Sequence, residues 1–334
     1  MPRHGRVLVV HLFDPAVIHE NLVSMMESHG AHSLALIGQG AMAEVHAEAW
    51  SELGLGSQIR YVCTPRPGAP LTHAPNAQFV TDLDVVLNDP EVDILSVCSP
   101  TGTHAEIAIR ALQAGKNVLL EKPIALTLAD AARVASCAAV SPGTFMVAHV
   151  VRFFDGYASM RTRAEAGGLG TVHSVRAGRY STPRQGTSWI TDDSASGGAL
   201  VDFAIHDFDQ LNLFLGTPLS VTAQPGDLPG SCDTTVTYTA GGRGIATTCN
   251  VMPVGYSFTS ALEITGSHGT ETFDYSEEST DSPYAAQAAY FLACVESGAS
   301  PALCPTESAV LALQVSLAAR ESFATGRTVE LRTE

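Results

Sequence analysis

Short apolar runs alternate with helical stretches from about residue 31 to residue 150. Each run holds three to five apolar or β-branched residues, and a stretch of helix-forming composition follows most of them. Strands that alternate with helices indicate βαβ units and a parallel sheet. The pattern therefore predicts strands at 34–37, 59–63, 94–98, 118–120 and 145–148, and helices at 41–53, 82–88, 104–114 and 128–139.

The pattern changes after about residue 150. Helical segments are now interleaved with longer alternating β segments, and some β segments are separated only by a turn, such as 239–243. Strands joined by short turns favour antiparallel hairpins. We therefore predict an α+β domain whose helices are 156–166, 198–215, 283–297 and 306–325, and whose strands include 172–180, 234–239, 244–251 and 260–265.

The length of 334 residues suggests two domains, because single cores rarely grow beyond about 250–300 residues. We place the first at residues 31–150 and the second at residues 151–334. Residues 1–30 have no assigned role. One interpretation is that they form an extra element at the edge of the first domain. The other is that an upstream start codon was assigned and that Met25 or Met26 is the true first residue.

Composition restricts the partners. The chain has 18 Lys and Arg residues against 34 Asp and Glu residues, a net charge of −16. This charge argues against a nucleic acid or an anionic membrane as partner, since phosphate binding requires clustered cations. Seven scattered cysteines without a CxxC pair fit a reducing compartment, and the histidines show no metal-ligand cluster. With no visible signal peptide or long apolar run, we expect a soluble cytoplasmic protein without a metal.

The first predicted strand leads directly into a glycine-rich turn that opens the first predicted helix. In this context the sequence G-x-G-x-x-A is typical of dinucleotide binding. The first glycine permits the tight turn, the second lets the backbone approach a pyrophosphate, and the alanine keeps the helix close to the sheet. An ordinary tight turn is the alternative. The candidate cofactor-binding residues are Gly38, Gly40, Ala41, Met42 and Ala43.

The end of the second strand bears on the choice between NAD and NADP. NAD recognition usually places an Asp or Glu there, for the ribose 2′-hydroxyl. The chain instead has Thr64, which can bond a hydroxyl or a phosphate, and Arg66, which can neutralise a 2′-phosphate. The sequence thus favours NADP over NAD. The alternative is that Arg66 points into solvent.

Two further segments are predicted at the carboxyl edge of the parallel sheet, where ligands bind in such folds. One is a polar loop after the strand at 94–98. The alternative for the histidine of this loop is that it lies at the start of the next helix and makes no contact with a cofactor. The other is Glu121-Lys122-Pro123, which places an ammonium group at the end of a buried strand, where the chain reaches the protein surface. The alternative is an ordinary Lys–Glu pair exposed to solvent. The candidate cofactor contacts of the two segments are Ser99, Pro100, Thr101, His104, Glu121 and Lys122.

A second constellation lies in residues 197–209. Asp202 and His206 are four residues apart, so on a helix they share one face. A carboxylate beside an imidazole raises its pKa and helps to position it, which suits general acid–base chemistry near neutral pH. The alternative is an ordinary surface ion pair, which would contribute little.

Three blocks, 93–104, 111–123 and 197–209, together resemble one family. It is the glucose–fructose oxidoreductase, inositol dehydrogenase and rhizopine catabolism family (Gfo/Idh/MocA), and the likeness covers about residues 31–331. The resemblance implies an α/β fold with an N-terminal Rossmann domain, which is a doubly wound parallel sheet. It also implies a C-terminal α+β domain with a large, mostly antiparallel sheet, commonly in homodimers or homotetramers.

The resemblance also implies an activity and site residues. Similar proteins oxidise a secondary alcohol of a sugar or cyclitol with NAD or NADP, or catalyse the reverse reduction. Lys122 corresponds to the family's active-site lysine, and Asp202 and His206 to its aspartate and catalytic histidine. We assign His206 as general base, Lys122 as stabilising the developing alkoxide, and Asp202 as binding a neighbouring hydroxyl or orienting the imidazole. Arg152 and Trp189 stand where similar proteins line the substrate pocket; packing between domains is their alternative.

Two other functions fit the same scaffold. A redox-cycling lyase or glycosidase would keep its cofactor bound and use transient oxidation to activate a neighbouring position. A regulator would sense a nucleotide without catalysis, but it would have no need of a proton-transfer group. The identity of the sugar or polyol substrate stays open.

Overall fold

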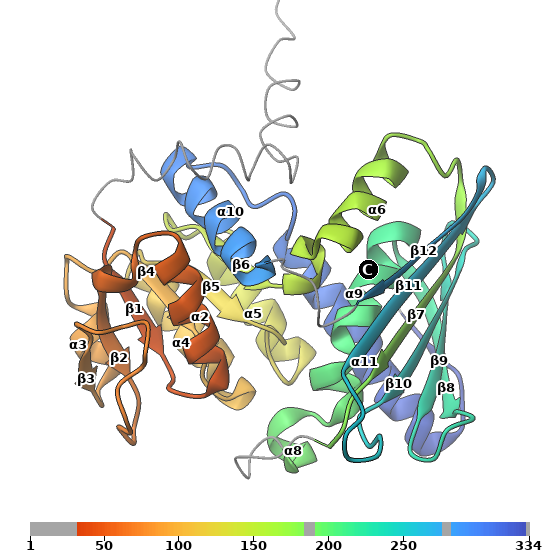
Figure 1. The fold of residues 1–334 in the computed structure, drawn as a ribbon, viewed down its shortest axis with the longest axis horizontal. Helices are drawn as coiled ribbons and strands as arrows, with labels where there is room; N and C mark the ends of the chain where they lie inside the picture. The colour runs from red at the N-terminus through yellow and green to blue at the C-terminus, as the bar shows by residue number, and fades with distance from the viewer. Residues whose placement is uncertain (1–31, 184–190, 276–281, 332–334) are drawn as a thin grey trace, which may run out of the picture.

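The computed structural model of the protein describes residues 32–183, 191–275 and 282–331. These residues form two layered units that lie side by side, each built around one sheet (Figure 1). The N-terminal segment 1–30 and the substrate candidate Trp189 lie outside the described residues.

The first unit is built on a six-stranded parallel sheet, which confirms the fold class predicted for this half. The strand order is β3-β2-β1-β4-β5-β6, so the winding direction reverses between β1 and β4, where ligands bind in such sheets. Only β3 was not predicted, because its three exposed or half-buried residues show no apolar run. The strands are β1 (Leu34–Ile37), β2 (Ile59–Cys63), β3 (Gln78–Val80), β4 (Ile94–Val97), β5 (Asn117–Glu121) and β6 (Phe145–Ala148).

Helices cover both faces of this sheet because its strands are apolar on both sides. Successive residues of β1 point in opposite directions, so Leu34 and Leu36 join the apolar cluster on one face and Ala35 joins the cluster on the other. Helix α2 covers the first face, and α3, α4 and α5 cover the second. The helices are α2 (Ala41–Glu52), α3 (Leu83–Leu87), α4 (His104–Gln113) and α5 (Leu128–Ala138).

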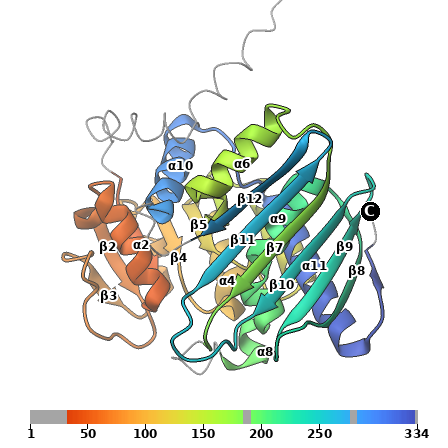
Figure 2. The ribbon, with the colours of Figure 1, turned by 45° about the vertical axis from the view of Figure 1, so that its right-hand side comes forward.

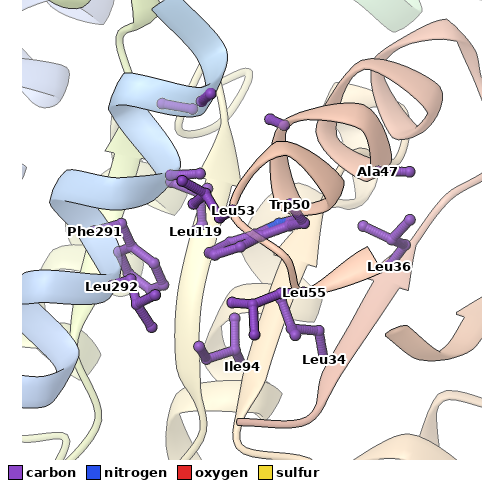
Figure 3. Close-up of a cluster of buried hydrophobic side chains, with 14 of the residues drawn as sticks. Leu34, Leu36, Ala47, Trp50, Leu53, Leu55, Ile94, Leu119, Phe291 and Leu292 are labelled. Carbon is purple, nitrogen blue, oxygen red and sulfur yellow. The ribbon is translucent and has the colours of Figure 1, made fainter. Parts of the chain in front are cut away.

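Helix α10 (Pro283–Ser297) comes from the C-terminal half of the sequence but packs on the first sheet, alongside α2 (Figure 1). Its Phe291 and Leu292 are buried in the same apolar cluster as Trp50 of α2 (Figure 3). Proline at its first position suits a helix start, because the missing N–H would have no intrahelical partner there. Packing therefore crosses the domain boundary that we placed at residue 150.

Helix α11 (Thr306–Thr325) belongs to both units. Ala309 and Leu313 lie in the apolar cluster beside α4 and α5, whereas Val315 and Ala319 lie in the cluster of the second sheet. Although α11 has 20 residues, no helix in the described part of the chain is both long and apolar enough to cross a membrane.

The second unit has a seven-stranded sheet in the order β12-β11-β7-β10-β9-β8-β13. Strands β7 and β10 pair in parallel and the other neighbours pair antiparallel, so the mostly antiparallel sheet is confirmed. The strands are β7 (Val172–Tyr180), β8 (Pro218–Pro225), β9 (Cys232–Tyr238), β10 (Arg243–Cys249), β11 (Thr259–Gly266), β12 (Gly269–Tyr275) and β13 (Val329–Glu330).

One face of this sheet is covered by helices α6 (Asp155–Glu165), α9 (Ile205–Leu215) and α11. In Figure 2, α9 and α11 lie behind the strands and α6 lies above β12. Alternate residues of β9 and β11 are buried against them, as expected for a sheet with one covered face. We did not predict β8 or β12. Proline at both ends of β8 is typical of a loop, and β12 consists mainly of polar residues.

The packing of α10 predicts a large effect for Phe291→Ala. The side chain is fully buried between α10 and the first sheet, so its removal should lower the free energy of unfolding by about 3–5 kcal/mol. Urea unfolding followed by circular dichroism would measure it. Phe323→Ala, at a side chain that is 44% exposed, is the control and should change stability by less than about 1 kcal/mol. Equal effects of the two variants would contradict this account of the core.

Candidate active site

The glycine-rich turn lies between the carboxyl ends of three neighbouring strands. Gly38 follows β1 with a φ of +112°, and its amide donates a hydrogen bond of 2.8 Å to the Cys63 carbonyl at the end of β2. A Cβ atom at Gly38 would lie 2.6 Å from the carbonyl oxygen of Cys98, just after β4. Both the backbone conformation and this close approach therefore require glycine.

Gly40 opens helix α2 and faces open space. It is the N-cap residue, no side chain among the described residues caps the helix, and a Cβ atom here would meet nothing within 4 Å. Ala41 is exposed, Met42 is half-buried and Ala43 is buried against the sheet. First-turn N–H groups have no intrahelical acceptor and favour an anion. The residues of this turn therefore fit the pyrophosphate of a dinucleotide.

The candidates for recognising the cofactor ribose lie just after β2. Thr64 is buried, whereas Arg66 is exposed. The loop that follows is tied to the glycine-rich turn by Gln39, whose side chain donates to the Ala69 carbonyl (2.5 Å) and accepts from the Gly68 amide (2.7 Å). Gln39 was not among the predicted site residues. An amide side chain in a turn beside a loop rich in proline and glycine was the only available signal.

The polar loop after β4 is joined to the end of β5. Thr101 is buried, and Ser99 bonds through its hydroxyl to Thr103 (2.7 Å). His104 is 1% exposed, with Nδ1 2.7 Å from the Pro123 carbonyl and Nε2 2.8 Å from the Ser99 carbonyl. His104 is therefore a buried bridge between the two segments and does not decorate the surface, while Pro100 of the same loop is exposed.

Lys122 connects the first unit to the second. It follows β5 directly, and its Nζ donates to the backbone carbonyl of Asp202 (2.7 Å) and to its carboxylate (3.1 Å). Both side chains are only 10% exposed, so water screens this ion pair weakly. An ammonium group has three N–H donors, and the described contacts of Lys122 use two of them. One donor can therefore serve a ligand.

The segment 198–215, expected as one helix, is divided in two. Gly197 and Gly198 have φ values of +86° and +77°, and a π-helical turn (Ala199–Phe203) follows them before α9 begins at Ile205. Asp202 lies in the π-helical turn and His206 in the first turn of α9. Single π-helical turns are rare and occur often at functional sites. The structure therefore places both residues where the helical geometry changes.

Two buried ion pairs hold α9 immediately after His206. Arg179 of β7 binds Asp207 (2.9 Å), and Arg152 binds Asp209 through two nitrogens (2.7 and 2.5 Å). Burial acts to raise the pKa of Asp209, but the charges of Arg152 and His149 and the hydrogen bond from Arg152 together outweigh burial and lower the pKa. Arg152 also donates to the Leu303 carbonyl (2.6 Å) and is 2% exposed. These contacts match the packing role that was the alternative for Arg152.

A cavity of about 210 Å³ adjoins Asp202. Its walls include Phe203 from the π-helical turn, Pro183 after β7, and Asn250 after β10. A carboxylate at the wall of a small cavity can bind a hydroxyl group of a ligand. Within the described residues no group of three His, Cys, Asp or Glu side chains is arranged to hold a metal ion.

His46 was not among the predicted site residues either. This residue of α2 is 2% exposed, with Nε2 2.9 Å from the Glu121 carboxylate and Nδ1 2.7 Å from the Ser96 hydroxyl. Burial disfavours the charged ring, but Cys98 and Glu121 outweigh burial and raise the pKa of His46 to about 10. The carboxylate of Glu121, a candidate cofactor contact, is thus bound by a histidine in the interior of the first unit. A histidine on the buried face of α2, beside Ala43 and Ala47, was the signal.

The fit of the glycine-rich turn to a pyrophosphate predicts the effect of Gly40→Ala. The new methyl group meets no protein atom but occupies the space that the phosphates need, so NADH should bind at least about tenfold more weakly, a loss of about 1.4 kcal/mol. Stability should change by less than about 1 kcal/mol. NADH fluorescence titration and urea unfolding measure the two effects, with Glu48→Ala on the exposed side of α2 as control. Unchanged NADH affinity would place the pyrophosphate elsewhere.

Comparisons with known proteins identify the family of the chain. Residues 33–149 match the GFO_IDH_MocA model, described as an oxidoreductase family with an NAD-binding Rossmann fold, and residues 157–271 match the C-terminal domain of the same family. The chain is 30% identical over 177 residues to an uncharacterized oxidoreductase of Streptococcus pneumoniae, a match that covers 52% of this chain and 48% of that protein.

Two further relatives cover more of the chain. An inositol 2-dehydrogenase of Rhizobium meliloti is 30% identical over 251 residues, which cover 70% of this chain and 73% of that protein. The crystal structure of a myo-inositol dehydrogenase from Corynebacterium glutamicum has the same fold, with a TM-score of 0.77, 23% identity, and coverage of 91% of this chain and 99% of that one. Since both domain models of one family match in sequence order, the chain belongs to the Gfo/Idh/MocA family of NAD-binding oxidoreductases.

Proposed function

We propose that this chain is an NAD(P)-dependent dehydrogenase that interconverts a secondary alcohol and a ketone of a sugar, cyclitol or related compound. The observation that carries the proposal is the Lys122 ammonium, held against Asp202 at the carboxyl edge of the first sheet. The inositol 2-dehydrogenase among the relatives supports a polyol as the substrate class.

The three candidate catalytic residues take separate roles in the proposed oxidation. His206 accepts the proton of the substrate hydroxyl, and Lys122 donates its remaining N–H to the same oxygen as negative charge develops on it. Asp202 holds the ammonium in place and presents its carboxylate at the cavity wall, where a neighbouring hydroxyl can bind. Trp189 stays a proposed substrate contact on the strength of the family resemblance alone.

The first unit supplies the cofactor site. When bound, NAD(P)⁺ supplies the acceptor for the hydride that leaves the carbinol carbon. The turn from Gly38 to Ala43 would hold the pyrophosphate, and the loop at Ser99–Thr101 would border the nicotinamide end. Both segments end neighbouring strands at the edge that carries Lys122.

Replacing Lys122 tests this assignment. Lys122→Ala should lower kcat by about 10²–10⁴-fold, because the alkoxide loses its charged donor, while NADH still binds. Lys116→Arg is a matched control. Lys116 is the only other lysine of the chain, and it directly precedes β5, at the opposite end of that strand from Lys122. Steady-state assays with inositols, aldoses and keto-sugars measure turnover at the nicotinamide absorbance.

The outcomes of that assay separate the proposal from its alternatives. Net reduction of free NAD⁺ or NADP⁺ in step with alcohol consumed supports a dehydrogenase. Product formation without net cofactor reduction would instead support the redox-cycling lyase or glycosidase. Full turnover by Lys122→Ala would remove Lys122 from the mechanism.

We also propose that NADP is preferred to NAD. The exposed Arg66 stands just after β2, where the chain has no acidic residue to bind a ribose 2′-hydroxyl. Arg66→Ala should weaken NADPH binding by about tenfold or more, since a charge-assisted hydrogen bond is worth about 1.5–3 kcal/mol, and should leave NADH binding nearly unchanged. Fluorescence titrations with both nucleotides measure this. Tighter binding of NADH than of NADPH by the natural chain would refute the preference.

A further inference from the structure

Both chain neighbours of Lys122 are held by buried histidines that come from different helices. Glu121, on one side, bonds to His46 of α2. The carbonyl of Pro123, on the other side, lies 2.7 Å from Nδ1 of His104 in α4. The two histidines are 2% and 1% exposed. The residue that carries the ammonium is therefore fixed on both sides by the interior of the first unit.

His46 links three elements of that unit. Its Nε2 lies 2.9 Å from the Glu121 carboxylate, and its Nδ1 lies 2.7 Å from the hydroxyl of Ser96. Ser96 belongs to β4 and pairs with Leu119 of β5, so the ring is held between neighbouring strands. Helix α2, which opens at the proposed pyrophosphate site, is thus connected to the strand end that carries Lys122.

We propose that His46 is a positioning residue of the dehydrogenase site: through Glu121 it fixes Lys122 and keeps a negative charge beside the Lys122 ammonium. This inference rests on the proposed function of Lys122. It adds a residue that lies inside the core and acts through another residue.

Opposing charges surround Glu121. Burial acts to raise its pKa, but the hydrogen bond to His46 and the positive charges of His46 and Lys122 outweigh burial and lower it. Besides Glu121, His46 faces the Cys98 thiol and, at 6.3 Å between ring centroids, Tyr284 of α10. Within the described residues, Asp202 of the π-helical turn contacts Lys122, and Glu121 of β5, His104 of α4 and His149 after β6 are close enough for electrostatic interaction with it. The proposed mechanism adds His206 of α9 to these groups.

Removing the charge of His46 should therefore change the titration of the Lys122 ammonium. His46→Gln retains a hydrogen-bond donor, but it leaves Glu121 as a buried carboxylate without its cationic partner. Buried carboxylates in that situation take up a proton. Once Glu121 is neutral, Lys122 loses a nearby negative charge and should release its proton at lower pH. A residue that merely filled space would not produce this effect.

The composition of the chain makes the effect directly measurable. Lys116 and Lys122 are its only lysines, so a protein labelled with ¹³C-lysine gives two side-chain signals in an NMR pH titration. Lys116→Arg assigns them. Lys116 lies at the other end of β5, where its Nζ donates to the carbonyls of Asp89 (2.7 Å) and Val92 (2.6 Å), and it serves as an internal reference.

We expect His46→Gln to move the titration midpoint of Lys122 down by about one pH unit and to leave that of Lys116 in place. Glu121→Gln, which removes the negative charge directly, should move Lys122 in the same direction and serves if His46→Gln does not fold. His32→Gln is the matched control, because His32 forms a similar pair with Asp93 (2.5 Å) at the opposite edge of the sheet. It should leave the Lys122 signal in place; the Lys116 signal is not used in this control, because the Asp93 charge acts on Lys116.

Kinetics supply the second measurement. In His46→Gln we expect kcat to fall about tenfold and its alkaline limb to move to lower pH, with the NADH dissociation constant unchanged. A Lys122 signal that titrates in folded His46→Gln as it does in the natural chain would overturn the inference, and where His46→Gln does not fold, the same result in Glu121→Gln would overturn it. Because the NMR titration needs no turnover, a shifted Lys122 signal in a chain that oxidises no compound of the panel would reject only the proposed function.

Discussion

The contact between the Lys122 ammonium and Asp202 joins the two units at the site, and the other features of the site serve to fix its two ends. One end is the residue that directly follows β5, a parallel strand paired with β4 on one side and β6 on the other. The other is a π-helical turn entered through two glycines with positive φ. A carbonyl and a carboxylate together bind the ammonium through charge-assisted hydrogen bonds, which fix its direction. Residues of the chain itself therefore orient Lys122.

Buried charges hold the second end. Arg152 and Arg179 approach α9 from different elements and bind Asp209 and Asp207, on either side of Phe208. Burying an ion pair gives little net stability, because desolvation offsets most of the attraction, but losing one partner is strongly destabilising. Such pairs therefore define the orientation of the helix more than they strengthen the fold. His206, one residue before Asp207, takes its position from them.

Local chemistry could be predicted from the sequence, whereas contacts distant in sequence could not. The glycine-rich turn and the end of β5 were recognisable because each motif is continuous and follows an apolar strand. His46 gave no comparable signal, since its partner Glu121 lies 75 residues further along the chain. The π-helical turn was also missed, because a helical periodicity does not show where one extra residue enters a turn. For Arg152 the sequence left both a pocket role and a packing role open, because its partner Asp209 lies 57 residues further along the chain.

The shared helices explain why the two halves of the site keep one relative position. Helix α10 completes the apolar core of the first sheet, and α11 has one half in the first unit and the other in the second. A cut at residue 150 would strip both helices from the first sheet and expose its apolar faces to water. The two units are therefore not independent folds joined by a linker, although the sequence divides them there. Lys122 and Asp202 belong to different units, and α11 packs in the cores of both, so the geometry of the site depends on both halves of the chain.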